Sequence, residues 1–66
     1  MKLLLRNPRR ELDVPAPHNV AQLLTDLDVL AESVLVIRND TLATKDERLH
    51  DHDVVEIRPV MSGGAQ

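Results

Sequence analysis

Residues 10–38, RELDVPAPHNVAQLLTDLDVLAESVLVIR, contain the patterns that determine the architecture of the chain. Residues 10–14 alternate between apolar and polar side chains, which is typical of a half-buried strand. Pro15 and Pro17 end this strand, because proline offers no backbone N–H to a neighbouring strand. The stretch therefore opens with a short strand that has one apolar face.

The clearest local signal in this stretch predicts a helix over about residues 20–28. Asn19 stands at the N-cap position, and Gln22 follows three residues later, where the partner of a capping box belongs. Apolar residues then recur at the spacing of one helix face. They are Val20, Leu23, Leu24 and Leu27.

The segment after the helix predicts further strands. Residues 33–38, SVLVIR, are almost continuously apolar, as in a strand buried on both faces. Asn39 and Asp40 predict a tight turn, with a short strand over residues 42–44 beyond it. A strand, a tight turn and a second strand in this order predict a hairpin.

Residues 45–52 are polar apart from one leucine, so they predict a loop with at most one helical turn. The β-branched run over residues 54–58 predicts the last strand, and Pro59 closes its regular pairing.

At the other end of the chain, residues 2–6 predict a strand that forms a hairpin with residues 10–14 around a turn at Asn7-Pro8. The element order is then strand, strand, helix, strand, a short optional strand, and strand. The helix lies in the crossover that parallel pairing of the flanking strands requires. This order predicts an α+β fold, the β-grasp or ubiquitin-like roll, with a mixed four- to five-stranded sheet packed on one helix.

Length and composition limit what the chain can do. Sixty-six residues predict a single domain, over residues 1–60, followed by a flexible tail over residues 61–66. The absence of cysteine excludes a disulfide framework and a thiolate zinc site. The absence of aromatic residues removes the platforms on which single-stranded nucleic acids stack their bases.

Charge and hydropathy indicate where the protein works. Eight basic and eleven acidic residues give a net charge of −3, which argues against direct binding to nucleic acid or to an anionic membrane. The opening MKLLLR is too short for a secretory signal peptide, and no apolar run is long enough to cross a membrane. We therefore expect a cytoplasmic protein with no membrane partner.

The tail ends with the sequence Ser-Gly-Gly-Ala-Gln over residues 62–66. Paired glycines fit a narrow channel and leave the carbonyl carbon of Gly64 open to a nucleophile, because glycine has no Cβ. Small residues also gather at ordinary frayed termini, which is the alternative interpretation. The position of Gly63 and Gly64 just after the last strand of a β-grasp fold favours a functional tail.

The chain resembles the ThiS/MoaD family of ubiquitin-like sulfur carriers. The resemblance is carried by HNVAQLLTDL at residues 18–27, VLVIRND at 34–40 and LHDHDVVEIRPVMSGG at 49–64. Members of that family typically show an L-x-D-G-D-x-V-x-I stretch, a short apolar-proline linker and a terminal Gly-Gly. The spacing of these features matches throughout.

Three positions depart from the family pattern. Asp40 and His52 stand where many relatives have glycine, and both residue types tolerate a positive φ better than most. Ala65 and Gln66 follow the second glycine, where relatives usually end.

The resemblance implies a carrier and not an enzyme, with no cofactor bound to the chain. An adenylyltransferase similar to ubiquitin-activating enzymes would use ATP to adenylate the carboxylate of Gly64, with Gly63 threading its active site. A sulfide or persulfide source would then form a thiocarboxylate, which a sulfur-acceptor biosynthetic enzyme consumes. Because Gly64 is bonded to Ala65, we expect a protease of the zinc-dependent isopeptidase type to cleave between them first.

Other residues carry weaker hypotheses. Arg58, Val60, Met61 and Ser62 adjoin the glycines and are candidates for partner binding, although Arg58 equally fits an ordinary strand-edge charge. Residues 50–52, His-Asp-His, alternate as metal ligands on a strand do, but in a polar loop they are more often solvated, so we predict no metal site.

Two surface groups also have ordinary interpretations. Arg6, Arg9 and Arg10 fit a solvated hairpin tip better than a phosphate contact. An apolar set could form either core or a docking face on the open side of the sheet, with core favoured. Its members are Val34, Val36, Leu42 and Met61.

Three functions remain open at this point. The first is a sulfur carrier for transfer-RNA thiolation, thiamine thiazole, molybdopterin or cysteine synthesis. Transfer RNA is slightly preferred, because the V-M-S-G-G ending is unlike the thiamine-type carriers and molybdopterin carriers tend to be longer than 66 residues. The second is a protein modifier joined through Gly64 to lysines of its targets. The third is a β-grasp interaction module in which the two glycines are incidental.

Overall fold

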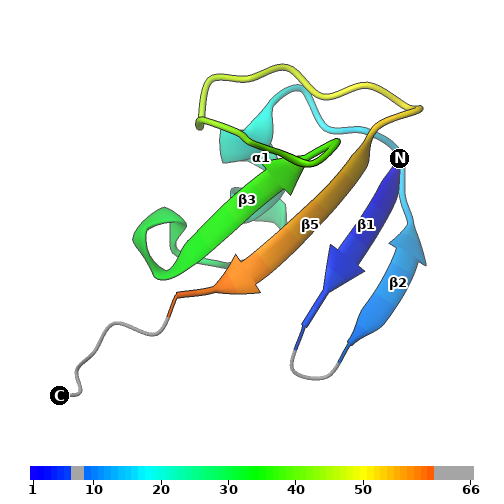
Figure 1. Cartoon of the computed structure of the whole chain (residues 1–66). Helices are drawn as coiled ribbons and strands as arrows, with labels where there is room; N and C mark the ends of the chain where they lie inside the picture. Colours follow the sequence, from blue (N-terminus) through cyan, green and yellow to red (C-terminus); the bar gives the residue numbers. More distant parts are fainter. Residues whose placement is uncertain (7–8, 61–66) are drawn as a thin grey trace, which may run out of the picture.

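A mixed sheet packs one of its faces on a single α-helix (Figure 1). The computed structural model describes residues 1–6 and 9–60, and within these residues the sheet has five strands. The strands are β1 (Lys2–Leu5), β2 (Arg10–Asp13), β3 (Val34–Arg38), β4 (Thr41–Leu42) and β5 (Val54–Pro59). The helix is α1 (Val20–Asp26), and a 3-10 turn, η1 (Ala31–Ser33), leads into β3. This arrangement confirms the α+β, β-grasp prediction.

The strand order is β2-β1-β5-β3-β4, so the first and last strands lie side by side in the middle of the sheet. β1 and β5 pair in parallel, whereas the other neighbouring strands are antiparallel. The sequence suggested parallel pairing of the strands that flank the helix, β2 and β3. These strands do run in the same direction, but they are not neighbours. β1 and β5 lie between them in the sheet, and β3 pairs with β5 instead of β2.

α1 begins where the sequence predicts. The Asn19 side chain accepts a hydrogen bond from the backbone N–H of Gln22 at 2.8 Å, which satisfies one free donor of the first turn. The second half of the predicted capping box is wrong, because the Gln22 side chain donates instead to Asp26 at 2.9 Å.

α1 ends at Asp26, two residues before the predicted end. Asp28 adopts a φ of 58°, and its N–H donates to the Thr25 carbonyl at 3.0 Å. The next N–H, of Val29, donates to the Leu24 carbonyl at 3.0 Å. These two bonds form a Schellman motif, in which a left-handed residue stops the helix.

The core fills the space between α1 and one sheet face. β5 contributes Val55 at 0% and Ile57 at 5% exposure, and α1 contributes the apolar stripe that the sequence predicts. The buried apolar residues are Met1, Leu3, Val20, Leu23, Leu24, Val36, Leu49, Val55 and Ile57.

β3 is covered on one face only, which corrects the expectation that residues 33–38 are buried on both. Val36 points into the core at 6% exposure, whereas Leu35 on the opposite face is 46% exposed. An apolar run in this position therefore supplies both a core face and an apolar open face.

The connections agree with the predicted turns, with small shifts. Asn39 and Asp40 form a two-residue hairpin loop with φ of 51° and 70°, which is the type I′ geometry. β4 begins at Thr41, one residue early, and residues 45–52 contain two short turns but no helix. Pro59 does not close the pairing, because it still lies opposite Val34 in the ladder.

The N-terminal hairpin pairs β1 with β2 as predicted, with Leu3 opposite Leu12. The turn predicted at Asn7-Pro8 lies outside the described residues.

Candidate functional site

The predicted sulfur-carrying end lies outside the described residues. This applies to Met61, Ser62, Gly63, Gly64 and Ala65. The structure describes the platform from which this segment leaves the sheet, including Arg58 and Val60 of the predicted partner-binding set.

β5 carries the chain directly to the tail. It lies between β1 and β3, so both of its edges are bonded to neighbouring strands. One residue beyond β5, the N–H of Val60 still donates to the Ser33 carbonyl at 2.9 Å. The main chain is therefore held to the sheet up to the residue before the tail begins, while Val60 as a whole residue is 40% exposed.

Two arginines meet one carboxylate on the open face near the tail end of β5. Arg58 Nε lies 2.9 Å from Glu56 Oε2, and Arg6 donates to the same oxygen through Nε and Nη2, each at 2.8 Å. The hydrogen bonds from Arg58 and then from Arg6 lower the pKa of Glu56. Arg58 is thus held by its own strand, and sequence reasoning did not foresee that Arg6, the residue after β1, would join it.

The apolar set proposed for core or docking divides between the two faces. Val36 belongs to the core and Val34 packs against it, as the favoured interpretation expected. Leu42 does not, because it is 62% exposed. Met61 lies outside the described residues.

A buried carboxylate that the sequence reasoning missed fixes the start of β5. Asp53 is 3% exposed and accepts hydrogen bonds from Asn39 Nδ2 at 3.0 Å, the His50 backbone N–H at 2.9 Å and Arg38 Nη1 at 3.3 Å. The Asn39 bond is the largest cause of a lowered pKa of Asp53, and the bonds from His50 and Arg38 add to it against the effect of burial. The signal in the sequence is an aspartate just before an apolar strand and after a polar loop.

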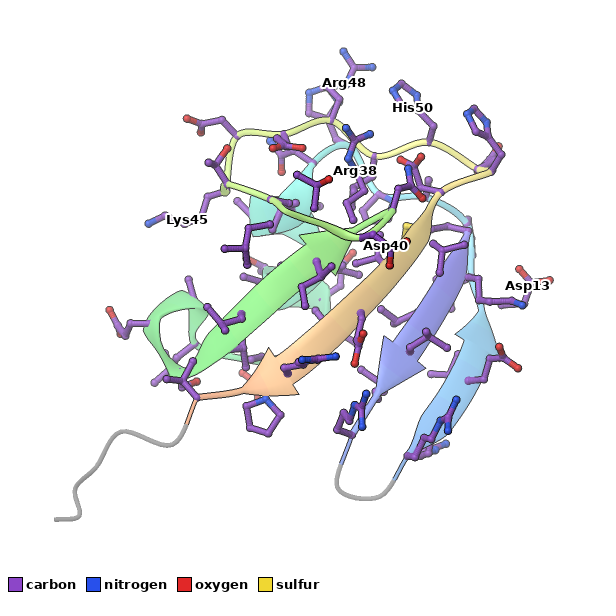
Figure 2. The ribbon with its side chains drawn as sticks, viewed as in Figure 1. Asp13, Arg38, Asp40, Lys45, Arg48 and His50 are labelled. Carbon is purple, nitrogen blue, oxygen red and sulfur yellow. The ribbon has the colours of Figure 1, made fainter. Side chains whose placement is uncertain are left out.

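Arg38 connects this carboxylate to the long loop. Its Nε lies 3.2 Å from Glu47 Oε2, while its Nη1 contacts Asp53. Figure 2 shows Arg38 and His50 at the end of the sheet where the long loop passes. The two acidic partners therefore hold the loop, the hairpin turn and β5 together.

The histidines at positions 50 and 52 stack on each other, with ring centroids 5.9 Å apart and an angle of 13° between planes. Over residues 1–6 and 9–60, the structure brings together no group of three His, Cys, Asp or Glu side chains able to hold a metal ion. In the same part of the chain, no helix has the length and hydrophobicity needed to cross a membrane.

The model of the ThiS family matches residues 3–64, which is nearly the whole chain. The chain belongs to the ThiS family. It is also 29% identical, over 65 residues, to the sulfur carrier protein TtuB of Thermus thermophilus, an alignment that covers 97% of this chain and all of the relative.

The structure explains the ThiS-type stretch L-x-D-x-D-x-V-x-I in this chain. Leu49, Val55 and Ile57 are its core residues, and Asp53 is the buried carboxylate described above. The other aspartate, Asp51, accepts a hydrogen bond from the Ala16 N–H at 3.2 Å. The stretch therefore positions β5, and the tail follows from it.

The two turn positions that were expected to tolerate a positive φ, Asp40 and His52, behave differently. Asp40 takes a positive φ, as expected for a glycine position. Among the described residues, positive φ occurs at Asp28, Asn39 and Asp40, so the turn at His52 does not need it.

Proposed function

We propose that the chain is a sulfur carrier whose Gly64, freed by removal of Ala65 and Gln66, is adenylated and converted to a thiocarboxylate. The thiocarboxylate then gives its sulfur to a biosynthetic acceptor enzyme, in transfer-RNA thiolation. The reactions take place in the cytoplasm, and the chain itself acts as a carrier without a bound cofactor.

The observation that carries this proposal is the extent of the family match. It ends at Gly64, so Ala65 and Gln66 fall outside the pattern that the ThiS family shares. The name of the Thermus relative, a sulfur carrier protein, supports the same function. The hydrogen bond from Val60 to Ser33 supports a tail that starts from a fixed point.

The chemistry requires an activating partner, because a carboxylate is a poor electrophile. The Gly64 carboxylate attacks the α-phosphorus of ATP and pyrophosphate leaves. Hydrosulfide then attacks the acyl carbon, AMP leaves, and the thiocarboxylate remains. No side-chain thiol is needed, which agrees with the absence of cysteine.

The test measures the intact mass of the protein purified from its own organism. We expect a species that lacks the Ala-Gln dipeptide and in which one oxygen is replaced by sulfur. In a reaction with the activating enzyme, ATP and sulfide, the form ending at Gly64 should be charged, while the full-length chain stays inert. Equal charging of both forms would contradict the processing step, and an untrimmed protein without sulfur would contradict the function.

The pathway and the competing functions need separate measurements. Loss of thiolated nucleosides from transfer RNA after deletion of residues 63–66 would support the thiolation pathway. Covalent attachment to many proteins in a lysate would indicate a protein modifier. An unchanged phenotype after the same deletion would indicate an interaction module.

A further inference from the structure

A groove opens at the free edge of the sheet, between α1 and the β3–β4 hairpin. Its volume is about 300 Å³. Its walls are mostly apolar and include Leu24 from α1 together with Val34 and Leu35 from β3. Leu42 and Lys45 line it from the hairpin side. A lysine therefore lies at the border of an apolar groove.

The backbone around this amine is held on both sides. The Ala43 N–H donates to the Val36 carbonyl at 2.9 Å, which ties the groove wall to β3. The Ala21 N–H donates to the Lys45 carbonyl at 3.0 Å, which ties the lysine to the first turn of α1. Figure 2 shows the Lys45 side chain extending away from the sheet. The backbone that carries this amine is thus held in place on both sides.

The other amines of the chain are engaged. The Met1 amine donates to the Val14 carbonyl at 2.7 Å, and its residue is buried. Lys2 forms an ion pair with Glu11 at 3.2 Å. Among the ion pairs within residues 1–6 and 9–60, none involves Lys45. Lys45 is therefore the amine best placed to react.

The C-terminal segment of the chain has the chemistry that this groove accepts. Val60 and Met61 are apolar, and methionine adapts to irregular apolar surfaces. Residues 62–64 are small, and four extended residues from Met61 to Gly64 span about 13 Å. We propose that Lys45 is an acceptor site for the C-terminus of a second copy of this chain, which lays Val60 and Met61 in the groove and delivers Gly64 to the Lys45 amine.

This inference rests on the proposed activation of Gly64, because a free carboxylate does not acylate an amine. The neutral Lys45 amine attacks the carbonyl carbon of the Gly64 acyl-adenylate. The C–N bond forms, AMP leaves, and the nitrogen loses a proton. The product is an isopeptide bond between two copies of the chain.

A chemical donor tests the acceptor site without the activating enzyme. The donor is the chain ending at Gly64 as an alkyl thioester and carrying Lys45→Arg, so that it cannot cyclise onto its own Lys45. The acceptor is the full-length chain, which cannot act as a donor because Ala65 blocks Gly64. Amide formation at mildly alkaline pH releases the thiol, and peptide mass mapping locates the linkage.

We expect the linkage at Lys45 of the acceptor. Its yield should be unchanged when the acceptor carries Lys2→Arg and should fall to zero when the acceptor carries Lys45→Arg. Leu42→Asp should slow it about tenfold, since it places a charge where the apolar segment docks. The matched control is Leu30→Asp, which changes a similarly exposed leucine (68% against 62%) that does not line the groove. This control should react at the wild-type rate.

Several results would overturn the inference. The first is equal linkage at Lys2 and Lys45, and the second is an equal reaction rate in Leu42→Asp and Leu30→Asp. The third is the absence of any linkage to the acceptor chain, although the same thioester acylates free lysine in a parallel reaction. A donor that keeps Lys45 and cyclises faster than it links to a second copy would show that the occupant is the chain's own tail. None of these results bears on whether Gly64 receives sulfur, which the intact-mass measurement decides.

Discussion

At the scale of single residues, the buried carboxylate of Asp53 joins segments that are distant in the sequence. It accepts bonds from the hairpin turn through Asn39, from β3 through Arg38 and from the long loop through the His50 N–H. Burying a charge without hydrogen-bond partners costs free energy, so these donors stabilise the buried carboxylate. The carboxylate in turn holds the three donors in place.

Replacing Asp53 with Asn keeps the shape of the side chain but removes its charge. We expect the free energy of unfolding to fall by about 2 to 3 kcal/mol, because Arg38 loses its buried partner. Urea unfolding at neutral pH measures the loss. Asp46→Asn, an exposed control in the same loop, should change it little.

The lowered pKa of Asp53 also gives the sign of a pH dependence. The folded state favours the charged form, so the contribution is complete above the ordinary aspartate pKa of about 3.9 and is lost as the pH falls through the lower folded value. The stability difference between wild type and Asp53→Asn should therefore shrink in acid. A difference that is constant down to strong acid would show that the charge is not its source.

At the scale of elements, the β3–β4 hairpin uses two residues with positive φ and no glycine. Asp40, with a φ of 70°, occupies the second position of a type I′ turn, where glycine fits without steric cost.

Asp40→Gly is therefore expected to stabilise the protein by about 0.5 kcal/mol, because it relieves the left-handed strain at this position. Thermal unfolding measures the gain. Asp46→Gly serves as the control, since Asp46 has no positive φ and the added backbone freedom should only destabilise. A loss of stability in both variants would contradict the explanation.

How much of each element could be predicted depends on whether its cause is local. The Asn19 cap and the stripe from Val20 to Leu27 are local, so the start of α1 was predicted correctly. Its end was not, because Asp28 takes the left-handed position that glycine usually marks. The exposed face of β3 was also missed, since Leu35 belongs to an apolar run that looks the same whether one or both faces are covered.

At the scale of the whole molecule, a chain of this size has a thin core, and its total stability is on the order of 5 kcal/mol. One central side chain therefore carries a large share of it. Val55 and Val54 are neighbours on β5, the first at 0% exposure and the second at 40%.

Val55→Ala should lower the free energy of unfolding by about 2 to 3 kcal/mol, because it leaves a cavity between α1 and the sheet. Val54→Ala removes the same atoms from the open face and should cost about 0.5 kcal/mol or less. Urea unfolding of the two variants measures the difference between their losses, from the midpoints of curves that have equal denaturant slopes. Equal losses would mean that strand propensity rather than burial determines the effect.

Contacts between distant segments were the least predictable from the sequence. Arg6 and Glu56 are separated by 50 positions, and only the parallel pairing of β1 with β5 brings them together. The element order predicted the fold class, but nothing local to either strand indicates that they are neighbours. The candidate site was predicted as the Gly-Gly tail, whereas Asp53 and the Arg6–Glu56–Arg58 cluster required the three-dimensional structure.

The central place of β5 has a consequence for how the protein is made. Of the five described strands β1 is synthesised first, but its parallel partner β5 is synthesised last, and β3 also waits for the same strand. The sheet therefore cannot close until β5 has left the exit tunnel of the ribosome, and folding must then form its most distant contacts at once. A product that terminates before β5 lacks both the strand that closes the sheet and the glycines that follow it, so such an unfolded product carries no chargeable end.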